Sequence, residues 1–300
     1  MRSLRPWMVL LLVALLLLGG CAPGGDEFSG SRAMSHVRRM VRMGSRAPGT
    51  EGNAEAAQYI TNQVERYDWK VERDCFAYGG ETLCNLIAKK GQGPIVLVGA
   101  HYDTRPLADR DLVDRTQPVP GANDGASGTA VLLELARTLD TSNLEGSQIW
   151  LVFFDGEDSG EIAGWEWGAG ASHLAQRLTK EPQNRVQYVI VADMIGDADQ
   201  QIYYEWSSTL WLKEELWRLA DSLGYGDTFL ASHKHHIIDD HTPFLQVGIP
   251  AVLLIDFDYP YWHTLDDTPD KLDAESLQRV GDVIKSWLED EPLAARAIAR

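Results

Sequence analysis

Basic residues are scarce in this sequence. Among 300 residues, 27 lysines and arginines stand against 44 aspartates and glutamates, which gives a formal net charge of −17. Such a chain would repel a phosphate backbone instead of releasing its counterions, which argues against nucleic-acid binding. Internal repeats with a period of about 20–50 residues are also lacking, so a solenoid is not expected. The 44% of hydrophobic residues are enough for one large globular core.

The longest hydrophobic run lies at the amino terminus and is too short to span a membrane. It extends from Trp7 to Leu18, after Arg2 and Arg5, whereas a membrane-spanning helix needs roughly 20 apolar residues. A secretory signal fits better, with an uncleaved anchor as the alternative. Residues 18–21 resemble a bacterial lipobox, in which the cysteine becomes the lipidated first residue. We therefore expect a lipoprotein signal peptide at residues 1–20, lipid attachment at Cys21, and an extracytoplasmic protein held on the bacterial cell membrane.

Cysteine is scarce as well, because only Cys75 and Cys84 remain once Cys21 is set aside. They flank Gly79 and Gly80. If these glycines form the two-residue loop of a hairpin, the two cysteines lie opposite each other at a non-hydrogen-bonded position, with Cα atoms about 4.5 Å apart. That distance is compatible with a disulfide, which fits an oxidising compartment. Two reduced thiols in an edge hairpin are the alternative.

Four short apolar runs predict strands that are buried on both faces. They cover residues 95–100, 148–154, 186–192 and 251–255, and helical patterns lie at 31–43, 53–67, 127–139, 168–178, 210–223 and 274–288. A hairpin is expected near 69–76 and 82–89. Strands that alternate with helices predict a three-layer αβα fold, with a mostly parallel mixed sheet and helices on both faces. We expect a tether at 21–30, a single domain at 31–290 and a tail at 291–300.

Acidic residues and histidines follow the buried strands. Open α/β sheets bind ligands beyond the carboxyl ends of their strands, so these side chains are expected to converge at one edge. Histidines and carboxylates gathered there need a counter-charge, and nitrogen and oxygen ligands without a thiolate suit zinc. The acidic and histidine residues that follow the strands in this predicted cluster are His101, Asp103, Asp155, Glu157, Asp158, Asp193 and His263.

Local spacing indicates separate roles within this cluster. His101 and Asp103 point to the same side of a strand, which suits a metal-binding imidazole held by a carboxylate. In the adjacent pair Glu157 and Asp158, one carboxylate can bind the metal while the other accepts a proton. Asp124 lies in a glycine-rich loop and could bridge two metals or bind one. A phosphate-binding loop is rejected because no Gly-Lys-Ser/Thr follows.

Six segments together resemble the zinc-dependent exopeptidase family of bacterial double-zinc aminopeptidases and glutaminyl-peptide cyclotransferases. They are AHYDT (100–104), GANDGASG (121–128), FFDGED (153–158), ADMIGD (192–197), DDHTPF (239–244) and WHTLDDTPD (262–270), within a resemblance that covers about residues 44–288. The resemblance implies that Asp124, Asp158 and His263 bind zinc and that Glu157 shuttles a proton. It also implies that His101 and Asp193 match the positions completing a second metal site in the aminopeptidases. Asp158 departs from the family pattern, which usually has Glu.

The resemblance is closer to the cyclotransferase branch. Trp262 precedes the metal histidine as in animal cyclases, and Asp239 matches a cyclase residue that hydrogen-bonds within the active site. Trp165 lies in a tryptophan-bearing loop, so Trp262 and Trp165 are the candidate substrate-binding residues, although Trp165 could simply cover the core. The implied reaction converts the amino-terminal glutamine of a peptide or protein to pyroglutamate and releases ammonia, with Glu157 and Asp239 as catalytic residues and one zinc ion.

Two other functions are kept open. An aminopeptidase with two zinc ions is favoured by the GANDGASG loop and by Leu253, where animal cyclases carry a histidine. A noncatalytic, peptide-binding lipoprotein is the third hypothesis. Of the remaining landmarks, His233, His235 and His236 are expected in a flexible polar loop near the cleft. Asp266 and Asp267 are expected either to orient His263 or to cap the last helix.

Overall fold

The computed structural model describes residues 27–142, 144 and 146–289. The strands are β1 (Lys70–Tyr78), β2 (Glu81–Gly91), β3 (Ile95–His101), β4 (Gln148–Phe154), β5 (Val186–Asp193), β6 (Ile202–Glu205), β7 (Phe229–His235) and β8 (Ala251–Ile255). The helices are α1 (Gly30–Val41), α2 (Glu51–Glu65), α3 (Ala126–Thr138), α4 (Ala169–Thr179), α5 (Leu210–Ser222), α6 (Thr242–Gln246) and α7 (Ala274–Glu289), with a 3-10 helix at Pro269–Lys271.

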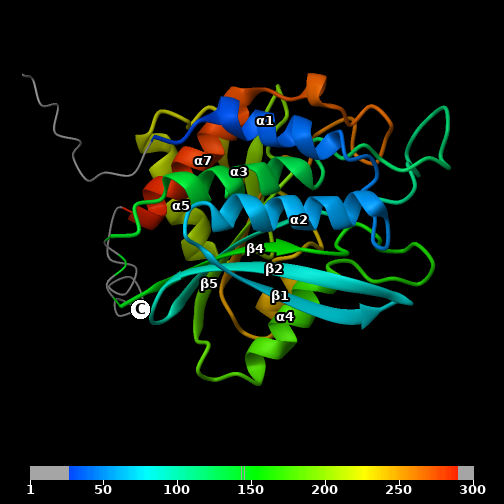
Figure 1. Cartoon of the computed structure of the whole chain (residues 1–300). Helices are drawn as coiled ribbons and strands as arrows, with labels where there is room; N and C mark the ends of the chain where they lie inside the picture. Colours follow the sequence, from blue (N-terminus) through cyan, green and yellow to red (C-terminus); the bar gives the residue numbers. More distant parts are fainter. Residues whose placement is uncertain (1–26, 143, 145, 290–300) are drawn as a thin grey trace, which may run out of the picture.

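The main sheet has six strands in the order β1-β2-β4-β3-β5-β8. The neighbours β4, β3, β5 and β8 are parallel, whereas β1 and β2 join antiparallel at one edge. Helices α1, α2, α3 and α7 lie on one side of this sheet and α4 on the other (Figure 1). The predicted fold class, a mostly parallel mixed sheet between two helical layers, is confirmed. All four parallel strands therefore direct their carboxyl ends toward the same edge.

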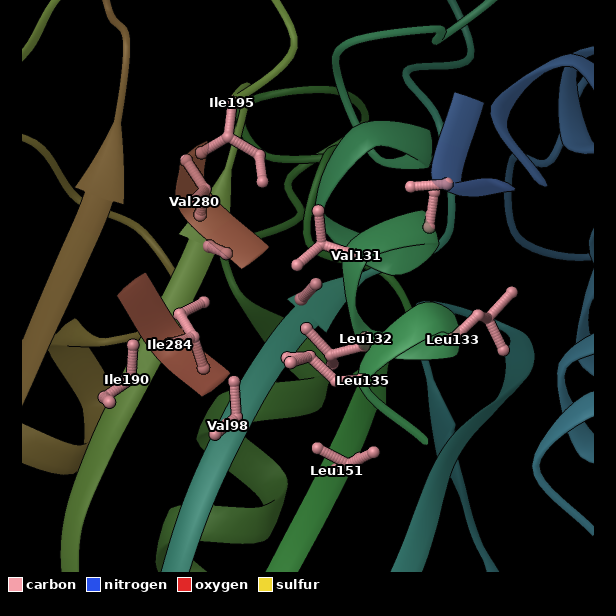
Figure 2. Close-up of a cluster of buried hydrophobic side chains, with 14 of the residues drawn as sticks. Val98, Val131, Leu132, Leu133, Leu135, Leu151, Ile190, Ile195, Val280 and Ile284 are labelled. Carbon is pink, nitrogen blue, oxygen red and sulfur yellow. The ribbon is translucent and has the colours of Figure 1, made fainter. Parts of the chain in front are cut away.

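Two hydrophobic cores hold the three layers together. On one face, Val98 and Ile190 of the sheet pack beneath Leu135 of α3 and Ile284 of α7 (Figure 2). On the other face, Leu174 of α4 belongs to a second core together with residues of β4, β5 and β8. Burial of both sheet faces explains why the parallel strands read as continuous apolar runs instead of alternating patterns.

A second, two-stranded sheet was not predicted. Strands β6 and β7 pair in parallel, so His233 and His235 lie on β7 and not in a flexible loop. The middle of β7 is exposed and rich in polar side chains, so its sequence lacks the apolar run or alternation that marks a strand. His236, directly after β7, lines a pocket of about 360 Å³.

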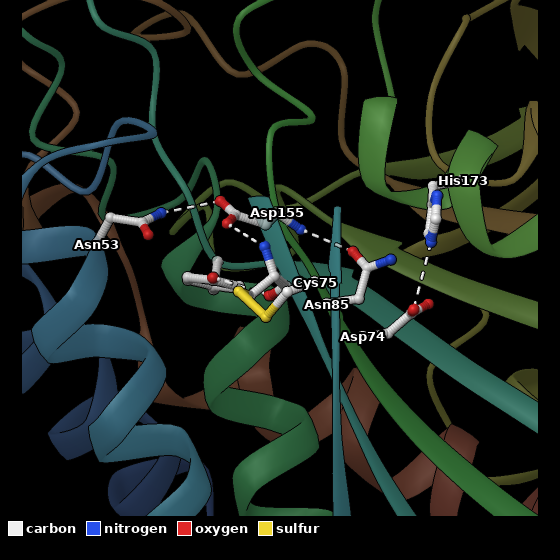
Figure 3. Close-up of a disulfide and its surroundings, with 8 residues drawn as sticks. Asn53, Asp74, Cys75, Asn85, Asp155 and His173 are labelled. Atoms are coloured by element: carbon white, nitrogen blue, oxygen red, sulfur yellow. Dashed lines mark hydrogen bonds and ion pairs between the residues drawn. A yellow bond between two sulfur atoms is a disulfide. The ribbon is translucent and has the colours of Figure 1, made fainter. Parts of the chain in front are cut away.

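The hairpin has the expected register. Cys75 of β1 pairs with Cys84 of β2, their Cα atoms are 4.1 Å apart, and a disulfide joins their sulfur atoms (Figure 3). The backbone N–H of Cys84 donates to the buried carboxylate of Asp155, which also accepts a hydrogen bond from Asn53. The hairpin is thereby tied to the loop that follows β4.

The folded domain begins slightly before the expected boundary at residue 31. Phe28 is buried against Gly281, and the side chain of Ser29 caps α1. The predicted signal peptide, the lipidation site Cys21 and the tail at 291–300 lie outside the described residues. Among the residues that are described, no helix has both the length and the apolar character required to cross a membrane.

Candidate active site

The ends of the parallel strands place the predicted ligands at one edge of the sheet. His101 is the last residue of β3 and Asp193 the last residue of β5. Asp158 follows β4 by a short turn, and Asp124 lies just before α3, where Gly125 takes a left-handed φ of 91°. His263 is in the segment after β8 and has a φ of 59°, a backbone conformation that costs energy for a residue with a side chain.

These five residues form two groups that share one carboxylate. Nε2 of His101 lies 3.1 Å from Oδ1 of Asp124 and 3.0 Å from Oδ1 of Asp193. Nε2 of His263 lies 3.1 Å from Oδ1 of Asp158 and 3.7 Å from Oδ2 of Asp124. Asp124 thus directs one oxygen toward each histidine, as a bridging ligand would. We call these five residues the ligand cluster.

Burial and close negative charges shift the pKa values of the ligand cluster. All five side chains are buried. Burial, together with the neighbouring charge of Asp124, raises the pKa of Asp158 to about 7. Burial alone would lower the pKa of His101, but the carboxylates of Asp193, Asp103 and Asp124 raise it well above its usual value. The cluster therefore holds excess negative charge that a cation would neutralise.

The cluster fits a divalent metal of the zinc type. Its donors are imidazole nitrogens and carboxylate oxygens, all within 4.8 Å of one another in each group, with no thiolate among them. Among the described residues, Oδ2 of Asp124 and Oδ2 of Asp158 are buried and have no hydrogen-bond partner. Buried polar atoms normally have a partner, and a metal ion would supply one.

Asp103 supports the cluster from behind. Its Oδ1 accepts a hydrogen bond from the backbone N–H of Glu157 at 3.1 Å, and its Oδ2 accepts one from the N–H of Asp158 at 3.2 Å. Oδ1 also lies 3.4 Å from Nδ1 of His101. One buried carboxylate therefore fixes the turn that carries the acidic pair and faces the imidazole of a candidate ligand.

Asp267 has a different role from either one expected of it. Its carboxylate accepts hydrogen bonds from the backbone N–H groups of Asn123 and Asp124, at 2.8 Å and 3.2 Å, and from the hydroxyl of Tyr259. It therefore holds the loop of the shared ligand and neither orients His263 directly nor caps the last helix. Asp266, in contrast, is exposed.

A pocket of about 360 Å³ opens beside the ligand cluster. The indole of Trp262 lies against the ring of His263, with centroids 4.0 Å apart, and Trp167 stacks over the same imidazole at 6.0 Å. The pocket wall also includes Glu157 and Asp239. The pocket wall therefore combines two tryptophans, Glu157 and Asp239 with four of the five members of the ligand cluster.

Trp165 lies apart from this pocket. Its ring meets Tyr78 edge-on at 5.1 Å and packs over Gly79 at the tip of the hairpin. Trp167, two residues later in the same loop, lines the pocket instead. Gly160 permits this placement, because a Cβ atom there would lie 2.1 Å from the Trp167 ring. The expectation that Trp165 lines the substrate site is therefore wrong, because Trp165 packs on the hairpin and Trp167 of the same loop faces the pocket.

Two carboxyl groups of the pocket wall, those of Glu157 and Asp239, have raised pKa values. Burial raises the pKa of Glu157 well above its usual value, and the charges of Asp239 and Asp240 add to this. Burial and the charge of Asp193 do the same to the pKa of Asp239. Groups with such perturbed pKa values are suited to moving protons near neutral pH.

Sequence reasoning missed two buried arginines near the cluster. Arg105 donates to the backbone carbonyls of Asp158 and Gly160 and lies over the ring of Trp167 at 4.9 Å. Arg46 is fully buried, and burial lowers its pKa to about 10, so it stays a cation at neutral pH. A lone arginine carries no local sequence signal for such a role, because its partners come from distant segments.

Comparisons with known proteins agree with this geometry. The chain is 28% identical to the glutaminyl-peptide cyclotransferase of Bos taurus, in a match that covers 81% of this chain and 77% of that protein. The crystal structure of Porphyromonas gingivalis glutaminyl cyclase matches with a TM-score of 0.82 at 29% identity, over 88% of this chain and 99% of that one. A leucine aminopeptidase precursor from Bacteroides thetaiotaomicron also matches with a TM-score of 0.82 at 28% identity, over 89% and 99%.

The family assignment follows from the match over most of the folded domain. Residues 85–288 match peptidase family M28. This range contains every member of the ligand cluster together with Glu157 and Asp239. The relatives above include both glutaminyl cyclases and an aminopeptidase. This chain therefore belongs to peptidase family M28.

Proposed function

We propose that this protein is a zinc-dependent glutaminyl-peptide cyclotransferase, which converts the amino-terminal glutamine of a peptide to pyroglutamate. The observation that carries the proposal is the pocket, in which Trp167 and Trp262 flank His263 and Glu157 shares the wall with Asp239. Its volume of about 360 Å³ is at the small end of ligand pockets, which suits one terminal residue. The similarity to cyclases supports the same reaction.

The chain's own residues account for positioning and proton transfer. The two indoles hold the glutamine side chain and exclude water, which favours intramolecular attack by the peptide's own amine. The reaction forms a bond between the α-amino nitrogen and the side-chain carbonyl carbon, and it breaks the bond to the side-chain amide nitrogen. Glu157 takes the proton from the attacking amine and passes it to the departing nitrogen, which leaves as ammonia. Its raised pKa makes its carboxylate a stronger proton acceptor than an exposed glutamate.

The remaining polar groups hold the reacting atoms. Burial raises the pKa of Asp239, which favours the protonated form that could donate a hydrogen bond to the substrate. Asp124, Asp158 and His263 are the residues that would hold the zinc ion, which when bound polarises the side-chain carbonyl of glutamine.

Removal of amino-terminal residues by an aminopeptidase with two zinc ions is the second candidate. The observation that favours it is the other ligand group, in which His101, Asp124 and Asp193 are all buried and close together. The similarity to a leucine aminopeptidase precursor agrees with it. In that reaction Glu157 would take the proton of the water that attacks the first peptide bond.

Product analysis distinguishes the two reactions. The purified protein is incubated with a peptide that begins with glutamine, and the products are identified by mass spectrometry and an ammonia assay. A mass loss equal to one ammonia, with ammonia in solution, is the expected result. Free glutamine would contradict the proposal, as would cleavage of a matched peptide that begins with leucine. The zinc content per chain gives a second readout, with one ion expected for the cyclase and two for the aminopeptidase.

A matched pair of variants tests whether the site is catalytic. Glu157→Gln is expected to lower turnover at least about 100-fold while zinc stays bound, because it removes only the proton acceptor. Glu166→Gln changes an exposed glutamate in the following loop and should leave turnover unchanged. Survival of activity in Glu157→Gln would reject the assigned base. Absence of turnover in the wild-type protein would favour the noncatalytic, peptide-binding function.

We also propose that the mature protein is attached to the cell membrane through a lipid on Cys21 and acts outside the cytoplasm. The support is the lipobox-like segment at residues 18–21, which precedes the described residues. Metabolic labelling with a fatty acid and cell fractionation test this proposal. The wild-type protein should carry label and follow the membrane, whereas Cys21→Ala should lose the label. Label on the Cys21→Ala variant would contradict the assignment.

A further inference from the structure

Arg46 is a fully buried cation that contacts the segments carrying the ligand cluster. It lies after α1, more than fifty positions before the first candidate ligand, and its exposed fraction is 0%. Burying a cation costs several kcal/mol unless its donors are well satisfied. The contacts that satisfy Arg46 show which parts of the fold it joins.

The guanidinium connects two loops that carry different ligands. Nε donates to the backbone carbonyl of Tyr102 at 2.9 Å, directly between His101 and Asp103. Nη1 and Nη2 donate to the carbonyls of Pro120 and Gly121 at 3.2 Å and 2.6 Å, just before the loop of Asp124. One planar, rigid group therefore bridges the end of β3 to the loop that precedes α3.

The backbone of Arg46 is held as firmly as its side chain. Its N–H donates to the hydroxyl of Thr104 at 3.0 Å, and its carbonyl accepts from the amide of Asn53 at 2.9 Å. The same Asn53 amide donates to Asp155, a bond visible in Figure 3. The contact is also closely packed, since a Cβ atom added at Gly121 would lie 2.8 Å from Nη2 of Arg46.

We propose that Arg46 is a positioning residue for the metal site, which fixes the loop of Asp124 relative to His101 so that the shared carboxylate reaches both histidines. A bridge made by three directed hydrogen bonds sets geometry, whereas a point charge would supply only attraction. The proposal rests on metal binding by the ligand cluster and holds for either of the two reactions considered above.

Zinc affinity of the folded, metal-stripped protein tests the role directly. Affinity is measured by competition with a chromophoric chelator, with zinc alone and no substrate. Supporting residues around metal ligands typically change affinity 10–100-fold, so Arg46→Met is expected to bind zinc at least roughly 10-fold more weakly. Arg46→Lys keeps the charge but loses the planar fork, and it should remain at least about 5-fold weaker than the wild type.

Two further variants keep the test decisive. Gly121→Ala would place a Cβ atom 2.2 Å from Thr104, 2.7 Å from the backbone oxygen of Asp124 and 2.8 Å from Nη2 of Arg46. It should therefore displace the same loop and weaken zinc binding, which serves if Arg46→Met fails to fold. Met40→Ala removes a buried core side chain of α1 and should lower the melting temperature without changing zinc affinity. Wild-type affinity in Arg46→Lys would show that charge alone matters and would overturn the proposal. So would unchanged or tighter binding in Arg46→Met or Gly121→Ala, or a wild-type chain that binds no zinc.

Because the assay contains no peptide, its result is independent of the product analysis. Weaker zinc binding in Arg46→Met supports the positioning role whether the protein is a cyclase or an aminopeptidase. If the product analysis rejected the cyclase assignment, the zinc measurements would still test the role of Arg46.

Discussion

Asp103→Asn is the substitution whose effect the structure defines most closely. The carboxylate accepts two backbone hydrogen bonds, from Glu157 and Asp158, and is fully buried. An amide has one oxygen, so one of the two N–H groups would face an NH₂ group and lose its partner. An unsatisfied buried donor costs about 1–3 kcal/mol, and loss of charge weakens the remaining bond by about 1 kcal/mol. We therefore expect the free energy of unfolding to fall by about 2–4 kcal/mol.

Function should fall with stability in this variant. The turn that Asp103 holds carries both the proposed base and a candidate ligand, so zinc affinity should drop roughly 10–100-fold. Urea unfolding of the metal-free protein and chelator competition measure the two effects separately.

A matched control separates site support from general stability. Glu205 is another buried carboxylate that accepts backbone N–H groups, from Ser207 and Ser208 among others, but it contacts no member of the ligand cluster. Glu205→Gln should therefore cost similar stability and leave zinc affinity unchanged. Equal zinc affinity in Asp103→Asn and the wild type would refute the reasoning.

Three further predictions follow from the described contacts. Burial alone would raise the pKa of Glu205, but hydrogen bonds from His241 and Ser207 hold it well below its usual value. The stabilisation is therefore complete above about pH 4.5 and lost as the pH falls below it, so the stability difference between the wild type and Glu205→Gln should shrink from pH 6 to pH 3 in urea titrations. An undiminished difference at pH 3 would contradict this. The disulfide closes a loop with a sequence separation of 9, so replacing Cys75 and Cys84 by serine should cost about 2.5 kcal/mol, and reductant should destabilise only the wild type. Equal stability of the two proteins would rule this out. Trp262→Ala should raise KM at least about 10-fold for a glutamine peptide, because an aromatic wall is lost, whereas Trp165→Ala should leave KM unchanged. The reverse pattern in steady-state kinetics would reassign the substrate wall.

The placement of the ligand cluster was predictable because the carboxyl ends of parallel strands lie next to each other at one edge of the sheet. Buried apolar runs are distinctive, and parallel strands necessarily bring the residues after them to one edge. His101 and Asp193 therefore meet although 92 positions separate them. The hairpin register was predictable for a similar reason, since a two-residue glycine loop fixes which residues face each other.

Other features depend on tertiary contacts that leave no local pattern. Trp165 and Trp167 share one loop, and only the fold determines that the second faces the pocket while the first packs on Tyr78. Asp267 accepts a hydrogen bond from the backbone N–H of Asp124, 143 positions away. No spacing in the sequence predicts this contact. Strand β7 was missed because its exposed polar residues obscure the alternation of a strand.

The order in which the ligands occur along the chain has a consequence for biogenesis. His101, Asp124, Asp158 and Asp193 are synthesised well before His263, which follows the last strand of the main sheet. A truncated or proteolysed product that ends before His263 would retain all eight strands yet lack one imidazole of the ligand set. The complete set of metal ligands would then be present only in chains that have been translated past His263.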